Sequence, residues 1–312
     1  MLTDCHTHLD PFSDDEVSEI MDRARAVMVG LVITAGTTVE SSTRSAQLSS
    51  RFSDIFSGVG IHPMHLRGPV DSKTFNELRQ LATSNEKVLV ISEIGLDFMD
   101  GTPDRALQYQ AFRTQIALAR ELRRPIIFHS REAHSETLRV LREERAYDVG
   151  GGMHYFQADL ETAQQAIDLG FYISLARPLL RLPHLQQVAA VLPLDRILLE
   201  TDAAPQPFKA KRQNWTEPRH VRDVAAKLAD KRRGSGGVAS VADNQARALI
   251  REFMTHSAAQ ATGAAGNKDH LILQFHRAGY SFPGIRSVLF VRLSMQFRQA
   301  HPGDKATRLR DG

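Results

Sequence analysis

Short apolar runs alternate with amphipathic stretches along most of this chain. Eight runs rich in Val, Ile and Leu predict buried β-strands. They cover Leu2–His8, Gly30–Gly36, Ile55–His62, Val88–Leu96, Pro125–His129, Gly151–Phe156, Phe171–Leu175 and Arg196–Thr201. Apolar residues at helical spacing between these runs predict helices over Asp14–Met28, Glu132–Arg145, Leu160–Leu169, Leu185–Val191 and Glu217–Lys231.

One further helix is expected after the fourth strand. The pair Thr102-Pro103 is typical of an N-cap followed by proline at the first helical position. A helix beginning there places Leu107, Ala111, Leu118 and Leu122 on one face. The chain therefore continues to alternate strand and helix in this region.

This alternation implies parallel strands joined by right-handed crossovers. Eight such units can close into a TIM-type (β/α)8 barrel, and closure removes exposed sheet edges. An open doubly wound sheet is the alternative. No glycine-rich phosphate loop follows an early strand, which argues against the open sheet.

The pattern predicts a barrel domain over residues 1–256 and a weakly packed or partly disordered C-terminal extension over residues 257–312. A flexible loop is expected at Arg232–Gly237, followed by a closing helix at Val241–Met254. The extension is rich in Lys and Arg. It is expected to be a solvated segment, although a basic tail can also contact nucleic acid.

Composition points to a soluble protein. Apolar residues make up 42% of the 312 residues and charged residues 24%, and the formal net charge is +3. The single cysteine, Cys5, excludes an internal disulfide and favours a reducing cytoplasm. The longest apolar stretch, Ala26–Ala35, is too short to span a bilayer, so no membrane association is expected.

Six potential metal ligands lie at the ends of predicted strands. In a barrel, the carboxyl ends of the strands meet at the active-site face. Burying so many imidazoles and carboxylates without cations would leave unpaired polar groups, at roughly 1–3 kcal/mol each. The sequence therefore predicts a two-metal hydrolytic centre made from His6, His8, Glu93, His129, His154 and Asp202.

The positions of these residues suggest how they are arranged. His6 and His8 are two apart on a strand and should point to the same side, whereas Cys5 and Thr7 should face the helices. Glu93 has two oxygens and can bridge metals about 3.5–4 Å apart. A salt bridge to an arginine would explain a buried Glu93 equally well.

Two more polar residues share a side with the predicted ligands. Arg131 lies two residues after His129 and could hold a substrate phosphate with its guanidinium. Glu200 lies two residues before Asp202 and could support it from behind, or form a salt bridge outside the barrel interior.

Five short motifs resemble those of the TatD family of metal-dependent hydrolases. They occur in the family's order, over about residues 1–250, at Asp4–Asp10, Gly60–Pro63, Glu93–Asp97, His129–Arg131 and Leu199–Asp202. The resemblance implies a TIM-type barrel and a divalent-metal nuclease, commonly acting 3′ to 5′ on DNA ends or single-stranded DNA.

The resemblance also implies a role for each matching residue. Of the two divalent ions, one is held by His6, His8, Glu93 and Asp202, and the second by Glu93, His129 and His154. Glu93 and Asp202 are then the catalytic carboxylates, with Asp202 orienting or deprotonating the attacking water. His62 becomes a substrate-binding residue near the leaving group or phosphate. The family favours Mg²⁺ or Mn²⁺, and Zn²⁺ is also compatible with the ligands.

Two stretches depart from the family's usual pattern. Gln157-Ala158 replace a Ser or Thr followed by Gly, and Thr216-Glu217-Pro218 replace Asn-x-Pro. Both should frame the substrate, so they leave its identity open.

The loop after the last strand carries basic and aromatic residues that suit nucleic acid. These are Phe208, Lys209, Lys211, Arg212 and Trp215. Trp215 is expected either to stack on a base or to pack on the barrel rim.

Two other function classes fit the same residues. The ligand set would also serve a barrel hydrolase acting on an amide, ester or lactone, such as an aminoacyl ester deacylase. A non-catalytic scaffold protein would be expected to have lost some of the ligands, and this sequence retains all six.

Overall fold

The structure is a computed structural model that describes residues 1–232 and 240–244. Within this part of the chain, eight parallel strands form one sheet in chain order. They are β1 (Leu2–Thr7), β2 (Val29–Ala35), β3 (Ile55–Val59), β4 (Val88–Asp97), β5 (Ile126–Arg131), β6 (Gly151–Met153), β7 (Tyr172–Leu175) and β8 (Ile197–Leu199).

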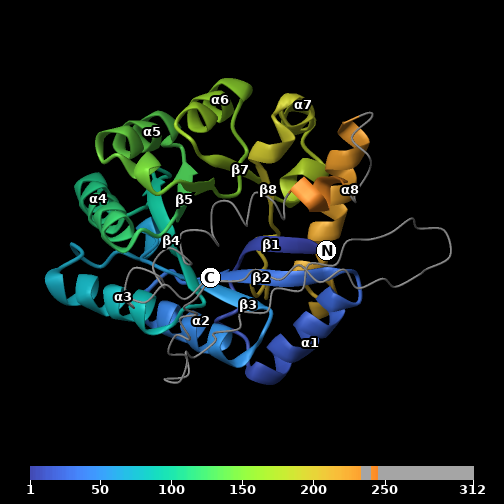
Figure 1. Cartoon of the computed structure of the whole chain (residues 1–312), viewed down its shortest axis with the longest axis horizontal. Coiled ribbons are helices and arrows are strands. Elements are labelled where there is room, and N and C mark those ends of the chain that lie inside the picture. Colours follow the sequence, from blue (N-terminus) through green and yellow to red (C-terminus); the bar gives the residue numbers. More distant parts are fainter. Residues whose placement is uncertain (233–239, 245–312) are drawn as a thin grey trace, which may run out of the picture. The chain divides into compact units, whose positions relative to one another are not determined.

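Helices follow the strands and surround them (Figure 1). They are α1 (Asp14–Arg25), α2 (Val39–Arg51), α3 (Ser72–Ser84), α4 (Arg105–Leu122), α5 (His134–Glu143), α6 (Leu160–Asp168), α7 (Pro183–Val191) and α8 (Val221–Lys231). None of the helices in the described ranges is long and apolar enough to cross a membrane.

The sheet closes where β1 meets the segment after β8. The N–H of Asp202 donates to the carbonyl of His6 at 3.1 Å, and the N–H of His8 donates to the carbonyl of Ala203 at 2.7 Å. Thr7 and Ala203 form a parallel bridge between these two hydrogen bonds. The predicted (β/α)8 barrel is therefore confirmed as a nearly closed barrel, and the open sheet is excluded.

The apolar core has two layers. The larger layer joins the outer faces of the strands to the inner faces of the helices, as at Val17 and Ile20 of α1. A smaller cluster consists of strand residues and fills the barrel interior. Its buried members are Cys5, Ile33, Phe56, Leu89, Val90, Ile127, Tyr172 and Leu198.

The expected orientation of Cys5 is wrong. Its side chain packs in the interior cluster with Ile33 and Leu198 rather than against the helices. The pairing of β1 with β2 is irregular between Asp4 and Thr7, and such an irregularity breaks the alternation of sides along a strand.

The sequence pattern missed or misplaced several element boundaries. The helix after β4 begins at Arg105 rather than near Thr102, because the side chain of Asp104 accepts the N–H of Ala106 at 2.8 Å and so forms the N-cap. The helix predicted from Glu217 begins at Val221, after a 3₁₀ turn at Pro218–His220.

Helices α2 and α3 were not predicted. The buried face of α2 consists largely of Ser42, Ser45 and Ser49, so it lacks the apolar stripe that marks an amphipathic helix. On α3, Leu78 and Ala82 are buried, and Phe75 and Leu81 pack against the core partly buried. The small buried side chains of α2 hide it from a hydrophobic pattern, whereas the apolar stripe of α3 was present in the sequence and was overlooked.

Part of the predicted C-terminal region lies outside the described residues. Residues 240–244 are helical, which agrees with the start of the helix predicted at Val241–Met254. The remainder of that helix, most of the loop at Arg232–Gly237, and the predicted extension over residues 257–312 lie outside the described ranges.

Candidate metal centre

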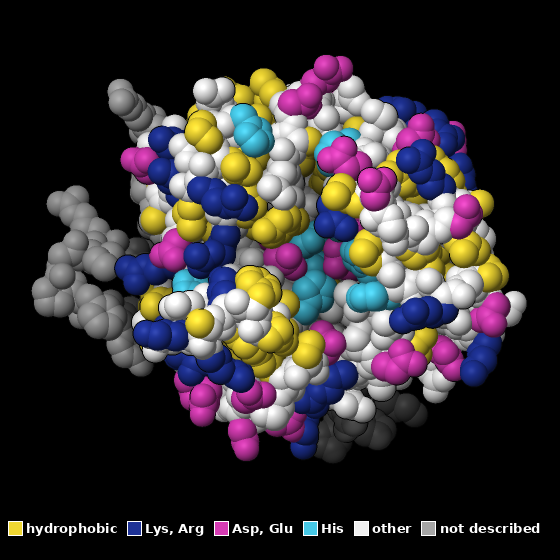
Figure 2. Space-filling model, turned by 180° about the vertical axis from the view of Figure 1, so that it is seen from behind, with side chains coloured by type: hydrophobic (Ala, Val, Ile, Leu, Met, Phe, Trp, Pro, Cys, Tyr) yellow, Lys and Arg dark blue, Asp and Glu magenta, His cyan; other side chains and the backbone are white. Residues whose placement is uncertain are grey.

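The six predicted ligands come together at the carboxyl ends of the strands. They line or lie beneath a cavity of about 800 Å³. Figure 2 shows histidine and acidic side chains together at the bottom of a hollow in this face of the molecule. The ligands come from β1, β4 and β5 and from the residues that follow β1, β6 and β8: His6, His8, Glu93, His129, His154 and Asp202.

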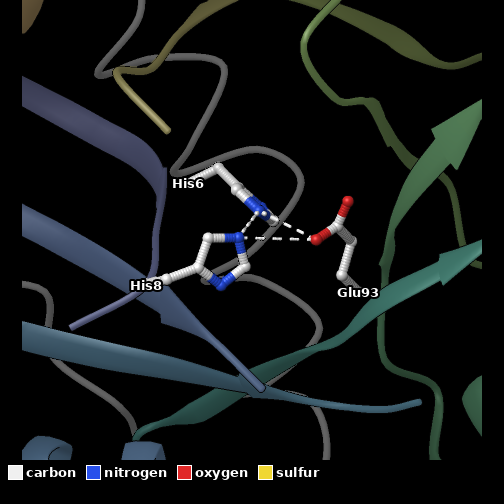
Figure 3. A group of neighbouring side chains, drawn as sticks. All are labelled: His6, His8 and Glu93. Atoms are coloured by element: carbon white, nitrogen blue, oxygen red, sulfur yellow. Dashed lines mark hydrogen bonds and ion pairs between the residues drawn. The ribbon is translucent and has the colours of Figure 1, made fainter. Parts of the chain in front are cut away.

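One half of the cluster surrounds Oε2 of Glu93. Nε2 of His6 and Nε2 of His8 each lie 3.5 Å from this oxygen, and they lie 3.3 Å from one another. Both rings point from β1 toward Glu93 on β4 (Figure 3). Oδ1 of Asp202 completes this half, at 3.3 Å from Nε2 of His8 and 4.0 Å from Nε2 of His6.

The other half surrounds Oε1 of the same carboxylate. Nδ1 of His129 lies 3.2 Å from Oε1, Nε2 of His154 lies 3.3 Å away, and Nε2 of His62 lies 3.4 Å away. The two oxygens of Glu93 therefore face two adjoining groups of imidazole nitrogens, whose rings meet where the ring centroids of His6 and His154 lie 3.9 Å apart. Glu93 itself is buried, with 3% of its surface exposed.

Two of the histidines are held by a contact to the ring nitrogen that faces away from the cluster, as metal-binding histidines usually are. The distal Nδ1 of His8 lies 3.2 Å from the carbonyl of Ala35. The distal Nε2 of His129 lies 2.9 Å from Oδ2 of Asp97. A proton on each distal nitrogen leaves the lone pair of the other nitrogen free to face the centre of the cluster.

His154 is supported by Glu200. Its Nδ1 lies 2.9 Å from Oε1 of Glu200, a contact without the alignment of a hydrogen bond. The Glu200 carboxylate is fixed by the N–H of Tyr155 at 2.7 Å and by the hydroxyl of Ser174 at 2.5 Å. Glu200 therefore contacts His154, rather than supporting Asp202 or forming a salt bridge outside the barrel interior, the two alternatives considered from the sequence.

His62 differs from the other histidines of the cluster. Its Nδ1 accepts a hydrogen bond from the N–H of Met64 at 3.1 Å, so the lone pair of that nitrogen is occupied. A neutral His62 then carries its proton on Nε2, which points toward Glu93. In this tautomer, inferred from the hydrogen-bond pattern, His62 is a hydrogen-bond donor and not a metal ligand.

The electrostatics of the cluster are those of a cation site. Burial raises the pKa of Glu93, but His62 and His154 outweigh this effect and hold the pKa well below its usual range. Burial lowers the pKa of His154, but Glu200 and Glu93 outweigh it and raise the pKa to about 10. Asp202 likewise overcomes the effect of burial and raises the pKa of His8 to about 9. Protons on His8 and His154 thus balance the carboxylate charge, and bound cations would replace these protons and leave both imidazoles neutral.

The donor atoms fit divalent cations. Around a cation with bonds of about 2.0–2.1 Å, tetrahedral ligand atoms lie about 3.3–3.4 Å apart. The contacts between Glu93 and the surrounding nitrogens are 3.2–3.5 Å long. His6, His8, Glu93 and Asp202 could hold one cation, and Glu93, His129 and His154 could hold a second. Imidazole and carboxylate donors together suit Mn²⁺ and Zn²⁺, and carboxylates suit Mg²⁺.

Arg131 has a different partner from the one expected. Its guanidinium contacts Oδ2 of Asp97 at 2.7 Å, so it is paired within the protein as well as facing the cavity. The same oxygen contacts His129. Asp97 lies within the Glu93–Asp97 motif but was assigned no role from the sequence. Its position as the acidic residue that ends β4, directly after Ile94-Gly95-Leu96, was the signal that could have indicated one.

Gly95 allows the strands that carry Glu93 and His129 to approach closely. Gly95 pairs with His129 across β4 and β5 and has a φ of +146°. A Cβ at this position would lie 2.0 Å from the carbonyl oxygen of His129. Only glycine fits there without displacing one of the two ligand-bearing strands.

Of the two aromatic residues in the loop after β8, Trp215 packs against the protein and Phe208 is exposed. The Trp215 ring lies 6.2 Å from that of Phe12, and the guanidinium of Arg212 lies over it at 4.9 Å. The ring is therefore packed on the barrel rim, the second of our two expectations. Phe208 is 80% exposed, and Lys209 lines a second cavity.

Comparison with known proteins places this geometry among metal-dependent hydrolases. The metal-dependent hydrolase YabD of Bacillus subtilis, which is uncharacterised, is 33% identical over 263 residues, or 80% of this chain and 99% of YabD. The 3′-5′ ssDNA/RNA exonuclease TatD of Klebsiella pneumoniae is 31% identical over 227 residues, or 70% of this chain and 84% of that protein. The crystal structure of YjjV, a TatD homologue from Escherichia coli, matches with a TM-score of 0.71 at 27% identity, covering 81% of this chain and 98% of YjjV.

The family model described as TatD related DNase matches residues 3–251, which include every residue of the cluster. This match agrees with the resemblance seen in the motifs. The chain belongs to the TatD family of metal-dependent hydrolases.

Proposed function

We propose that this protein is a two-metal 3′-5′ exonuclease that hydrolyses phosphodiester bonds of single-stranded DNA. The observation that carries the proposal is the position of Glu93, whose two oxygens each face a different set of imidazole nitrogens, His6 and His8 on one side and His129 and His154 on the other. A carboxylate placed between two ligand groups is suited to bridging two ions. The exonuclease name of the Klebsiella relative supports a nucleic-acid substrate.

Two divalent cations, when bound, stabilise negative charge on a phosphoryl group and make water more acidic. The proposed ligands are His6, His8, Glu93 and Asp202 for one ion, and Glu93, His129 and His154 for the other. This nitrogen-rich set does not select among Mg²⁺, Mn²⁺ and Zn²⁺.

Asp202 is placed to act on the attacking water. Its side chain is 31% exposed and lines the cavity, whereas that of Glu93 is 4% exposed. Burial raises its pKa, but His8 and the neighbouring histidines outweigh burial and lower it, so Asp202 is ionised at neutral pH. An ionised carboxylate that solvent reaches can orient a water molecule and accept its proton.

His62 and Arg131 are proposed to contact the phosphate. The Nε2 proton of His62 points into the cluster, and burial lowers the pKa of this histidine, which keeps it neutral. A neutral donor in this position stabilises charge on a phosphoryl oxygen without competing for a proton. Arg131 lines the same cavity with its guanidinium fixed by Asp97.

The single cysteine, Cys5, favours a cytoplasmic location for this activity.

The proposal is tested with metal-depleted protein and single-stranded oligonucleotides labelled at either end. Adding Mn²⁺ or Mg²⁺ should release mononucleotides from the 3′ end, and metal analysis should find two ions per chain. Glu93→Gln should lose both properties, whereas Glu121→Gln, a matched change in a surface ion pair with Arg79, should keep them. Hydrolysis of an aminoacyl ester or a lactone with no release from the oligonucleotide would favour the other hydrolase class.

A further inference from the structure

A second cavity lies beside the metal cluster, at the ends of β7 and β8. Its volume is about 280 Å³, and its lining includes Arg177, Arg181 and Lys209. Arg177 and Arg181 follow β7, and Lys209 belongs to the loop after β8. In TIM barrels, the loops after the seventh and eighth strands frequently form a phosphate-binding site.

The two cavities adjoin one another. Tyr155 and Asp202 line both of them, so the proposed metal ligand Asp202 forms part of the wall between the two cavities. A group bound in the small cavity would therefore be a near neighbour of a group bound at the cluster. Along a nucleic-acid strand, the neighbour of a scissile phosphate is the next phosphate.

The positive charges of the small cavity are available to a ligand. Within the described ranges, the guanidiniums of Arg177 and Arg181 make neither an ion pair nor a hydrogen bond with the protein. Arg181 is exposed and Arg177 is half-buried. The ammonium of Lys209 donates to the carbonyl of Asn214 at 3.0 Å and retains two further protons.

The large cavity lacks such free positive charge. Arg131 is the one Lys or Arg among its lining residues in the described part of the chain, and its guanidinium is paired with Asp97. The cluster itself is proposed to take two cations for the scissile phosphate. A second phosphate, one nucleotide away, would find its counter-charges in the small cavity and not in the large one.

The loop after β8 holds one wall of the small cavity in place. The side-chain carbonyl of Gln206 accepts the N–H of Thr216 at 2.9 Å, and both residues line the cavity. Their amide and hydroxyl groups add neutral hydrogen-bond donors to the three positively charged side chains of Arg177, Arg181 and Lys209. Convergent cationic and neutral donors are the usual composition of a phosphate site.

We infer that the cavity lined by Arg177, Arg181 and Lys209 binds the phosphate that neighbours the scissile one. This inference rests on the proposed nuclease function and adds a specificity site to it. It implies that substrates with at least two successive phosphates are preferred over a single phosphodiester.

The test compares two substrates and one binding measurement. The specificity ratio is kcat/KM for a single-stranded oligonucleotide divided by kcat/KM for bis(4-nitrophenyl) phosphate, which has one phosphate only. The double variant Arg177→Ala/Arg181→Ala should lower this ratio about tenfold or more. Arg222→Ala/Lys227→Ala removes the same charge from α8, outside the lining of both cavities, and should preserve the ratio.

Binding is measured separately by fluorescence anisotropy of a labelled oligonucleotide in EDTA, over a range of salt concentrations. Losing contact with one phosphate should reduce the slope of log K against log salt by about 0.7. Arg181→Ala alone is a second variant that should retain the fold, because Arg181 is exposed.

The outcomes separate the inference from the proposed function. If the wild type cleaves the oligonucleotide, and the arginine variants match it in both ratio and salt slope, the second phosphate site is wrong and the nuclease stands. If the wild type cleaves neither phosphodiester, both are overturned.

Discussion

Asp97 provides the most discriminating test of how the centre is built, because it acts on the cluster through His129. Its side chain is fully buried. Oδ2 lies 2.9 Å from Nε2 of His129 and 2.7 Å from the guanidinium of Arg131, and Oδ1 accepts a hydrogen bond from the N–H of Met99 at 3.1 Å. Every group around this carboxylate is a donor once Nδ1 of His129 faces a cation.

Asp97→Asn keeps the shape of the side chain and replaces one acceptor with a donor. Turned one way, the new amide N–H₂ meets His129 and Arg131; turned the other way, it meets the N–H of Met99. A buried donor is left without an acceptor in either case, at a cost of about 1–3 kcal/mol in the free energy of unfolding. The imidazole of His129 also loses the carboxylate that makes it a stronger base.

Loss of such a supporting carboxylate typically weakens metal binding or activity by about 10–100-fold, or about 1.4–2.7 kcal/mol. We therefore expect Asp97→Asn to need about 10–100-fold more Mn²⁺ for half-maximal hydrolysis. Metal titrations of activity and isothermal titration calorimetry measure this change, and urea unfolding measures the stability. Asp148→Asn makes the same substitution in a surface ion pair with Arg120 and should change neither quantity appreciably. Metal binding by Asp97→Asn equal to that of the wild type would refute the role of Asp97 behind His129.

Three further predictions concern the same region. Gly95→Ala should lower the free energy of unfolding by more than about 1–3 kcal/mol, because the clash with the His129 carbonyl adds to the backbone strain of a positive φ. Thermal unfolding measures this loss, and Gly68→Ala is the control because a Cβ there meets nothing within 4 Å. His62→Phe keeps a ring but removes the donor, so it should reduce kcat about 10–150-fold with two metals still bound. Metal analysis showing one lost ion would make His62 a ligand instead. Metal at about 100 times its Kd should stabilise the wild type against urea by about 2.7 kcal/mol per site, whereas Glu93→Gln should show little of this gain.

The barrel could be predicted because each strand corresponds to a short apolar run in the sequence. All eight runs contain the observed strands or overlap them closely, as at Val88–Leu96 against β4 at Val88–Asp97. The predicted ends ran too far where a polar or proline-containing turn follows. β3 stops at Val59, and His62 begins a 3₁₀ turn at Pro63. Helix α2 was not predicted because serine and alanine form much of its buried face, whereas α3 was missed although Phe75, Leu78 and Leu81 mark its apolar face.

The candidate ligands could be predicted for a related reason. A histidine or carboxylate that ends an apolar run is conspicuous, and parallel strands bring all such ends to one face of the barrel. The supporting contacts could not be predicted, because they depend on which side chain lies behind which ring. Glu200 supports His154 rather than Asp202, and Asp97 is shared by His129 and Arg131. Those pairings follow from the packing of neighbouring strands and leave no trace in residue order.

At the seam between β1 and the segment after β8, residues at the first and last strands of the barrel meet in one centre. At this seam, Asp4 accepts the N–H of Thr201 at 2.9 Å, across 197 positions in sequence. His6, His8 and Asp202 flank the same seam. A nascent chain still lacking its last strand has the first two histidines but not their aspartate partner. The complete ligand set can therefore form only after Asp202 has been synthesised, and an ion held by His6, His8 and Asp202 would link the first strand to the segment after the last one.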